Sequence, residues 1–345
     1  MDAQPIRSPW EAAPGPGEAT EVAPGILWLR LPLPMKLDHV NVFALDEGDS
    51  WTVIDTGIGT PKARAIWEQL LSDGPLAGKP VGRVVLTHHH PDHMGLAGWL
   101  MAGQGASLTA TRTAWLLARM LQLDVQATPR DEVRLFWRRA GMDPAFYREY
   151  LTQRPFNFAD LTSPLPLGFE RICEGDRLHM GGRDWVVRIG HGHAPHHATF
   201  WCEGEPLVLG GDQLLPSISP NLGVSATEPD ADPVGEWLES CDRLSQFARD
   251  DQLVLPGHKL PFTGLPARIV QMIDNHTSAL ERLHTHLATP RRGGECFMPL
   301  FKREITGDAY VLALAETVGH LNHLLLTGRA TREPGPDDAY IWRQA

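Results

Sequence analysis

The sequence predicts an α+β protein, and two patterns along the chain carry that prediction. Short apolar runs bounded by glycine, proline or aspartate gather in residues 25–55 and again in residues 177–209, and such runs are typical of strands. Apolar residues at helical spacing lie between these groups and again from residue 266 onward. An apolar fraction of 42% and a charged fraction of 21% are those of a globular chain with a buried core.

Strands come first along the chain. Turn residues separate three strand candidates, which are Gly25–Leu31, His39–Leu45 and Trp51–Asp55. A helix is predicted over Pro61–Asp73, where Trp67 and Leu70 lie on or near one face. The short apolar run Val84–Leu86 predicts another strand, and a second helix is predicted over Met94–Met101.

Residues 112–168 differ in character from the strands around them, and we interpret them as a helical insertion. Arginines and aromatic residues alternate there at helical spacing, which predicts helices over Trp115–Leu123, Glu132–Arg139 and Pro144–Leu151. A later helix is predicted over Pro233–Phe247. The strands predicted after the insertion are Arg177–Met180, Trp185–Ile189, Ala198–Cys202, Leu207–Leu209 and Leu253–Leu255.

The chain is predicted to contain one large domain and a smaller C-terminal region. Residues 1–22 are rich in proline, glycine and alanine and are expected to form a flexible tail. Residues 23–265 are predicted to be the main domain, residues 266–334 a helical region, and residues 335–345 a second tail. Within the helical region, residues 329–333 are a candidate for a short strand pair.

Charge and cysteine usage exclude several classes of protein. A net charge of −11 does not attract phosphate backbones over distance, which counts against nucleic acid as a partner. The four cysteines show no C-x-x-C spacing, so reduced thiols are expected in place of a zinc knuckle or redox pair. The first residues have no apolar signal core, and no stretch reaches about 18 consecutive apolar residues, so we expect a cytoplasmic protein with no membrane span.

A dense group of histidines follows the predicted strand at residues 84–86. The segment His88-His89-His90-Pro91-Asp92-His93 holds four histidines and one aspartate. Imidazole is rarely chosen for packing, whereas neutral imidazole and carboxylate are good ligands for zinc and similar divalent metals. Alternate side chains of an extended segment share a face, so His88 and His90 point to one side and His89 points away. Asp92 and His93 follow the turn at Pro91 and can face a second point nearby.

Further histidines and aspartates follow the ends of later predicted strands. They are His191, His193, His196 and His197 after the strand at 185–189, Asp212 after 207–209, and His258 after 253–255. Functional groups on a sheet scaffold are commonly presented at such strand-to-loop junctions. A glycine near each group would let the backbone approach a crowded metal centre.

These motifs, taken in order, resemble the metallo-β-lactamase superfamily. The resemblance covers residues 25–262 and includes Ile54-Asp55-Thr56-Gly57, His88-x-His90-x-Asp92-His93, His193, Asp212 and His258. The subgroup resembled is the glyoxalase-II-like set of hydrolases. The family fold implied is an αββα sandwich, here with the helical insertion and a C-terminal region, residues 266–334, that resembles a winged-helix appendage.

The resemblance implies a binuclear metal centre. The implied ligands are His88, His90 and His193 for the first metal, Asp92, His93 and His258 for the second, and Asp212 as the bridge. Asp55 matches an outer position where a carboxylate orients a ligand histidine. His193 is preferred over His191 because it fits the family's Gly-His-x-Pro pattern. Two divalent ions are expected, with zinc first and iron or manganese as alternatives, because nitrogen and oxygen ligands suit all three.

The enzyme implied is a binuclear metal-dependent hydrolase in which a metal-bridging hydroxide attacks the substrate, because metal binding lowers the pKa of water to about 7. Asp92 and Asp212 are the candidate catalytic carboxylates that hold or move the proton. The favoured substrate is a carboxylic acid derivative, such as a thioester, lactone or ester. The alternatives are a phosphodiesterase or ribonuclease, weak β-lactamase activity, or a metal-binding interaction protein without catalysis.

Two observations count against nucleic acid cleavage. Only 45 residues separate Asp212 from His258, too few for the large inserted domain of the superfamily's nucleic-acid-cleaving branch. Residues 266–345 carry nine basic and nine acidic residues, so the C-terminal region is not basic. We therefore expect a small-molecule substrate and neither a nucleic acid nor a membrane as partner. The oligomeric state stays open, with a homo-oligomer among the options.

The insertion is expected to lean over the mouth of the metal site. Its aromatic residues, Trp137 and Phe146 among them, would then form an apolar wall that contacts the substrate. The alternative is that these aromatic side chains pack only among themselves. Outside the proposed ligands, His39 and Asn41 are equally compatible with a structural role and a site role, and His89, His196 and His197 are candidates for the border of the site. Surface or packing roles are predicted for the five histidines of the C-terminal region, which are His276, His284, His286, His320 and His323.

Overall fold

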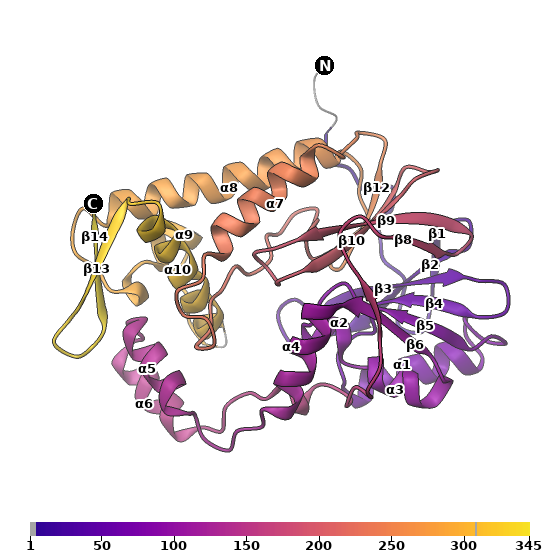
Figure 1. Cartoon of the computed structure of the whole chain (residues 1–345), viewed down its shortest axis with the longest axis horizontal. Coiled ribbons are helices and arrows are strands. Elements are labelled where there is room, and N and C mark those ends of the chain that lie inside the picture. Colours follow the sequence, from indigo (N-terminus) through magenta and orange to yellow (C-terminus); the bar gives the residue numbers. More distant parts are fainter. Residues whose placement is uncertain (1–4, 308) are drawn as a thin grey trace.

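Two β-sheets lie together in one half of the molecule, on the right in Figure 1, in the computed structural model, which describes residues 5–307 and 309–345. The first sheet has seven strands in sequence order. They are β1 (Thr20–Ala23), β2 (Ile26–Pro32), β3 (His39–Asp46), β4 (Trp51–Ile54), β5 (Val81–Val85), β6 (Ser107–Thr111) and β7 (Glu170–Ile172). The first four strands run antiparallel to one another, and β4 to β7 run parallel.

The second sheet has five strands in the order β12-β11-β10-β9-β8. They are β8 (Arg177–Met180), β9 (Arg183–Gly190), β10 (His197–Cys202), β11 (Leu207–Gly211) and β12 (Leu253–Pro256). Strands β8 to β11 pair antiparallel, and β12 joins β11 in parallel. Because β10 runs antiparallel to both β9 and β11, the strands β9 and β11 point the same way. Strand β12 is parallel to β11 and shares that direction.

The two sheets pack face to face through large apolar side chains. Trp28 and Phe43 of the first sheet and Trp185 and Phe200 of the second belong to one buried cluster. Alternate residues of a strand face opposite sides of its sheet, so the other side chains of β3, such as Val42, face the outer helices. Both faces of β3 are therefore buried, and its burial is nearly continuous.

Helices cover the outer face of each sheet, which completes the predicted helix–sheet–sheet–helix order (Figure 1). The first sheet is covered by α1 (Pro61–Ser72) and α3 (Ala97–Gln104), and the short α2 (Pro91–Met94) precedes α3. The second is covered by α7 (Pro233–Ser245) and α8 (Leu265–His286). The α+β class and the sandwich architecture predicted from the sequence are thus confirmed.

Some elements differ from their predictions. The helix predicted over Met94–Met101 is divided into α2 and α3, because Leu96 leaves helical geometry between them. A Cβ at Gly95 would lie 2.4 Å from the Pro91 carbonyl oxygen and 2.8 Å from that of Gly57, so the chain is closely packed at this break. Strands β1, β6 and β7 were not predicted. They have three to five residues and show little apolar alternation, so their partners define them more than their sequence does.

The insertion is helical, as predicted, and lies between β6 and β7. It contains α4 (Arg112–Leu123), α5 (Asp131–Arg139), α6 (Pro144–Thr152) and the 3-10 turn η1 (Phe158–Asp160). Thr111 caps α4 and Asp143 caps α6, each through a side-chain oxygen that accepts from backbone N–H groups. In Figure 1, α5 and α6 lie beside the C-terminal helices and away from the two sheets.

The C-terminal region consists of helices and one strand pair. After α8 come the 3-10 turn η2 (Gly293–Glu295), α9 (Phe297–Phe301) and α10 (Ala309–Leu326), then β13 (Ala330–Pro334) paired antiparallel with β14 (Tyr340–Gln344). The prediction placed a strand pair within residues 329–333. It is wrong, because residues 330–333 belong to a single strand, β13, whose partner is β14. Residues 335–345, predicted as a tail, contain β14, and buried Trp342 anchors this strand to the cluster that also holds α8 residues.

The N-terminal segment is also more integrated than its composition predicts. Trp10 packs edge-on against Trp28 at 6.2 Å, and Arg7 pairs with Thr263 through backbone hydrogen bonds. The tail prediction is thus wrong for residues 5–22, where aromatic packing and backbone pairing hold the chain, and residues 1–4 lie outside the described residues. Among the helices that the structure describes, not one is long and apolar enough to cross a bilayer.

The insertion packs against α10 through a cluster of aromatic and aliphatic side chains. Trp137 is 8% exposed within it, and Phe146 stacks on Tyr310 with ring centroids 4.3 Å apart. The cluster as described contains none of the seven predicted metal ligands. The aromatic rings singled out for substrate contact thus join the insertion to the C-terminal region, and their contact with substrate stays a prediction.

Trp137→Ala is expected to lower the free energy of unfolding by about 3–5 kcal/mol, because it removes a buried aromatic side chain and leaves a cavity. Chemical denaturation measures this loss. The matched control is Leu123→Ala in the same insertion, where a side chain 71% exposed should cost less than about 0.5 kcal/mol. A Trp137→Ala protein of unchanged stability that turns over bulky substrates poorly, and small ones normally, would instead favour the substrate wall.

Candidate metal centre

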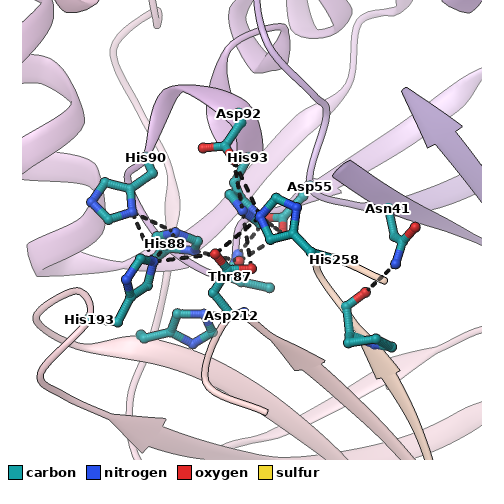
Figure 2. Close-up of polar contacts among 12 residues, drawn as sticks. Asn41, Asp55, Thr87, His88, His90, Asp92, His93, His193, Asp212 and His258 are labelled. Carbon is teal, nitrogen blue, oxygen red and sulfur yellow. Dashed lines mark hydrogen bonds and ion pairs between the residues drawn. The ribbon is translucent and has the colours of Figure 1, made fainter. Parts of the chain in front are cut away.

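The predicted ligands meet because the strands that carry them end at one edge of the sandwich. His88 follows β5, His193 follows β9, Asp212 follows β11 and His258 follows β12. Strands β9, β11 and β12 point the same way, so their carboxyl ends share an edge. Figure 2 shows side chains from the two sheets converging there. Three overlapping groups of donor atoms result, namely His88/His90/His193, His88/His93/Asp212 and Asp92/His93/His258.

The first group consists of three imidazole nitrogens that face one another. His90 Nδ1 lies 3.0 Å from His88 Nε2 and 3.0 Å from His193 Nε2, and the latter two atoms are 3.3 Å apart. Burial lowers the pKa of His88 and of His90 well below the usual value, with neighbouring imidazoles adding to the effect. The rings of His88 and His90 are therefore neutral and carry free lone pairs, the form in which histidine binds metal.

The other two groups share His93 and combine imidazoles with carboxylates, and together they form the second donor group. His258 Nε2 lies 3.2 Å from Asp212 Oδ2 and 3.4 Å from Asp92 Oδ2, and His93 Nε2 lies 3.4 Å from Asp212 Oδ1. Asp212 Oδ2 also lies 3.4 Å from His193 Nε2, so this one carboxylate reaches both groups. Burial alone would raise the pKa of Asp212, but the His258 and His93 rings outweigh it and hold the pKa well below its usual value. The carboxylate is therefore ionised.

Two buried polar atoms of the site lack a hydrogen-bond partner in the part of the chain that the structure describes, as expected of atoms that bind a metal ion. Among the described residues, His93 Nε2 and Asp212 Oδ1 have no hydrogen-bond partner although both are buried. An unsatisfied buried polar group costs about 1–3 kcal/mol, so such atoms require an explanation. Nitrogen and oxygen donors 3.0–3.6 Å apart suit ligands that each lie about 2.0–2.2 Å from a shared zinc-like ion. The His/Asp cluster therefore suits a binuclear metal site.

Asp55 is hydrogen-bonded to two residues of the segment 87–93, which contains the first four donor residues. Its Oδ2 accepts hydrogen bonds from His93 Nδ1 at 2.8 Å and from Thr87 Oγ1 at 2.7 Å, and its Oδ1 accepts from the Thr87 amide at 2.8 Å. Asp55 is almost fully buried and has a positive φ of 61°. That conformation is uncommon for residues other than glycine, and several hydrogen bonds hold the side chain against His93. That Asp55 orients a ligand histidine stays a prediction.

The histidine of the last strand is oriented by residues whose role the sequence left open. His258 Nδ1 donates to the His39 carbonyl oxygen at 2.7 Å, and the His39 Nε2 accepts from the Lys259 amide. Asn41 donates from Nδ2 to the Pro256 carbonyl at 2.9 Å, as Figure 2 shows, and to the Lys259 carbonyl at 2.8 Å. His39 and Asn41 thus fix the turn that carries His258, from more than 200 positions away in sequence.

The remaining histidines divide into neighbours of the site and residues outside the donor groups. His197 is fully buried, stacks on His88 at 4.6 Å and accepts the Asp212 amide hydrogen at Nε2. His191 does not join the donor groups as described and packs against His196, so the structure brings His193 to the site, as preferred. His89 points away from the donors but stacks against Phe158 of η1, with centroids 6.3 Å apart. His197, predicted as a candidate for the border of the site, thus lies against the donors, whereas Phe158 was not singled out, because no motif marks it.

Gly257→Ala is expected to disturb the centre strongly. A Cβ there would lie 2.3 Å from Asp212 Oδ1 and 2.8 Å from His93 Cε1, and the Gly257 amide is tied to the Gly211 carbonyl. Overpacking of this kind costs about 1–3 kcal/mol, which corresponds to roughly a tenfold to hundredfold loss in metal affinity. Metal titration of the apoprotein measures it. Gly204→Ala, where a Cβ has no described heavy atom within 4 Å, should bind metal as the unsubstituted protein does; equal losses in both would contradict the argument.

Comparison with known families agrees with this geometry. The family described as "Metallo-beta-lactamase superfamily" matches residues 35–258, a range that includes every donor of the three groups. A second description, "Metallo-beta-lactamase-like, C-terminal domain", matches residues 280–345, which include α10, β13 and β14.

Whole-chain relatives share both parts. A "Beta-lactamase domain protein" of Burkholderia ambifaria has 34% sequence identity and a TM-score of 0.85, covering 99% of this chain and 97% of that one. A "metallo-beta-lactamase family protein" of Thermus thermophilus has 29% identity and a TM-score of 0.78, covering 94% and 100%. The "Probable metallo-hydrolase YqjP" of Bacillus subtilis (strain 168) is 27% identical over 317 residues, which is 87% of this chain and 92% of the relative.

Proposed function

Because this chain belongs to the metallo-beta-lactamase superfamily, we propose that it is a glyoxalase-II-like hydrolase of a carboxylic acid derivative, namely a thioester, a lactone or an ester. The observation that carries the proposal is the position of Asp212, whose carboxylate lies within 3.4 Å of histidine nitrogens in both donor groups. The chain has no cysteine among these donors, and Asp92 occupies a donor position. Both features favour a general hydrolase over a dedicated β-lactamase.

The residues proposed to hold the two ions are the donors already described. His88, His90 and His193 form the first set, Asp92, His93 and His258 form the second, and Asp212 is shared. Zinc is the metal we propose, since imidazole and carboxylate donors suit it. When bound, two divalent ions supply a water of lowered pKa as nucleophile and stabilise negative charge on the substrate oxygen.

The carboxylates differ in their access to a reacting group. The Asp92 side chain is 20% exposed, against 7% for Asp212 and 3% for Asp55. We assign proton transfer to Asp92, because it is the most accessible of the three and its Oδ2 lies 3.4 Å from His258 Nε2. Asp212 would contribute to holding both ions, because its carboxylate contacts nitrogens of both donor sets. Asp55 holds Thr87 and His93, and through them the whole histidine segment.

An apolar part of the substrate is supported by the insertion. Phe158 lies against His89, next to the donor His90, so the insertion reaches the metal loop at this ring. The same insertion exposes Leu116, Met120 and Phe156, which are 52%, 42% and 60% exposed. The ring of Phe156 lies against that of Phe158, with centroids 5.9 Å apart. An exposed apolar ring near a polar centre suits an acyl chain or a similar group whose electrophilic carbon lies at the centre. A small-molecule substrate and a cytoplasmic location remain part of the proposal.

A phosphodiesterase or ribonuclease is the second candidate. Helices α8, α9 and α10 followed by the β13–β14 pair have the composition of a winged-helix-like unit, which supports this alternative. The balance of nine basic and nine acidic residues over residues 266–345 argues against a phosphate backbone as ligand. Weak β-lactamase activity would be a side reaction of the same carbonyl chemistry.

A substrate panel tests the proposal. The protein, purified without chelator, is assayed with thioesters, lactones, esters, β-lactams and phosphodiesters, and Asp212→Ala serves as the background. We expect kcat/KM for the best carboxylic acid derivative to exceed that for any phosphodiester by about a hundredfold or more, equivalent to about 2.7 kcal/mol in transition-state stabilisation. Faster turnover of a phosphodiester would overturn the carboxylic assignment in favour of the alternative.

A further inference from the structure

The loop between β11 and α7 is held along its length by α10. Asn322 donates from Nδ2 to the carbonyls of Pro229 and Ala231 at 2.9 and 3.0 Å, and His323 Nδ1 lies 3.0 Å from both carboxylate oxygens of Asp232. The chain leading into α7 passes beside α10 in Figure 1. The C-terminal region and the main domain are thus connected by specific polar contacts in addition to apolar packing.

Asn221, in the same loop, makes contacts in two directions. Its side-chain Nδ2 donates to Glu316 Oε2 at 2.9 Å and to the Leu312 carbonyl at 3.1 Å, both on α10. Its main-chain carbonyl lies 3.0 Å from His193 Nδ1. A carbonyl oxygen only accepts, so the His193 Nδ1–H donates to it and Nε2 is left with the lone pair that faces His88 and His90.

A glycine in α10 allows the loop between β11 and α7 to pack closely against the helix. A Cβ at Gly319 would lie 2.5 Å from the Leu222 carbonyl oxygen, so only glycine permits this approach. Glycine within a helix costs about 0.5–1 kcal/mol relative to alanine, and the close contact with the loop accounts for its presence. The next turn of the loop is bonded as well, since the Val224 amide donates to the Ala315 carbonyl at 3.3 Å.

We infer that α10 of the C-terminal region belongs to the metal centre, with Asn221 and Glu316 as positioning residues that fix the ring of His193. The inference rests on the proposed metal-dependent function and extends it to a part of the chain outside the match to residues 35–258. Partners that orient ligand histidines typically contribute tenfold to a hundredfold in metal affinity. Here that contribution comes through one residue, because Asn221 is bonded both to His193 and to α10.

The protonation state of Glu316 makes Glu316→Gln a conservative substitution. Burial raises the pKa of Glu316 to about 8, although its bond from Asn221 acts in the opposite direction. The side chain is therefore mainly a neutral acid at pH 7, and its interaction with Asn221 needs an acceptor oxygen and no charge. Glu316→Gln keeps such an oxygen in the same place, whereas Glu316→Ala removes it.

Metal affinity, measured by competition with a chromophoric chelator as zinc is titrated into the apoprotein, tests the inference. Asn221→Ala and Glu316→Ala should each weaken one of the two zinc equivalents about tenfold to a hundredfold and leave the other within about threefold. The double variant should be no weaker than Asn221→Ala, because Asn221→Ala already removes the contact with Glu316 together with the one to the Leu312 carbonyl. Glu316→Gln should bind zinc within about threefold of the unsubstituted protein.

The control is Leu324→Ala, which removes a fully buried side chain from the same helix without touching Asn221 or Glu316. It should lower thermal stability and leave both zinc affinities unchanged. Unchanged affinity in Asn221→Ala and Glu316→Ala, or an equal loss in Leu324→Ala, would overturn the inference while leaving the proposed function intact. If the unsubstituted protein binds none of zinc, iron and manganese, the proposed function itself has failed.

Discussion

Asp212→Ala is expected to lower kcat/KM for hydrolysis by about a thousandfold or more, which is about 4 kcal/mol of transition-state stabilisation. Among the described residues, Asp212 is the carboxylate within 3.4 Å of nitrogens in both donor groups, so its removal deletes the contact that the two groups share. It also leaves His258 and His93 beside a cavity in which their main carboxylate partner is missing. Steady-state kinetics and metal content, measured on the same preparation, report the loss.

His89→Ala is the matched control for this experiment. His89 lies in the same histidine segment and is 8% exposed, but its ring faces Phe158 and belongs to none of the donor groups described. We expect a loss of about tenfold or less, since only the packing of the segment changes. If both folded variants lose activity equally, the assignment of alternate side chains to separate faces is wrong.

Removal of metal is expected to abolish hydrolysis, and its return is expected to restore it. The donors form two sets around a shared carboxylate, so protein purified without chelator should contain two metal ions per chain. Elemental analysis measures the number, and dialysis against a chelator followed by titration with zinc, iron or manganese identifies the metal that restores the rate. One ion or none per chain in active protein would contradict the binuclear assignment.

The histidine motif was predictable because its information is local. His88, His90, Asp92 and His93 lie within six positions, and the alternation of an extended segment together with one turn at Pro91 already assigns their directions. The later donors were found by a different signal, a histidine or aspartate directly after an apolar strand. The choice of His193 over His191 needed the family pattern, because both follow the same strand, β9.

Other parts of the site depend on contacts between distant segments and could not be predicted. Asn41 was left open between a structural and a site role, and its contact with the turn that carries His258 decides the matter only in the structure. Asn221, which joins His193 to α10, was not singled out by any motif. The insertion shows the same limit. Its helices were predicted from their own spacing, but the sequence does not record that Trp137 packs towards α10, because that depends on how two regions are arranged in space.

The metal donors come from both sheets, and this arrangement affects folding. His88 and His93 extend from the first sheet, and His193 and His258 from the second, so an ion held between them cross-links the two halves of the sandwich. Such a cross-link closes a long loop, and a ligand that binds only the folded state stabilises it by about 2.7 kcal/mol at a hundredfold excess over Kd. With metal bound in this way, the melting temperature is expected to rise with free metal concentration.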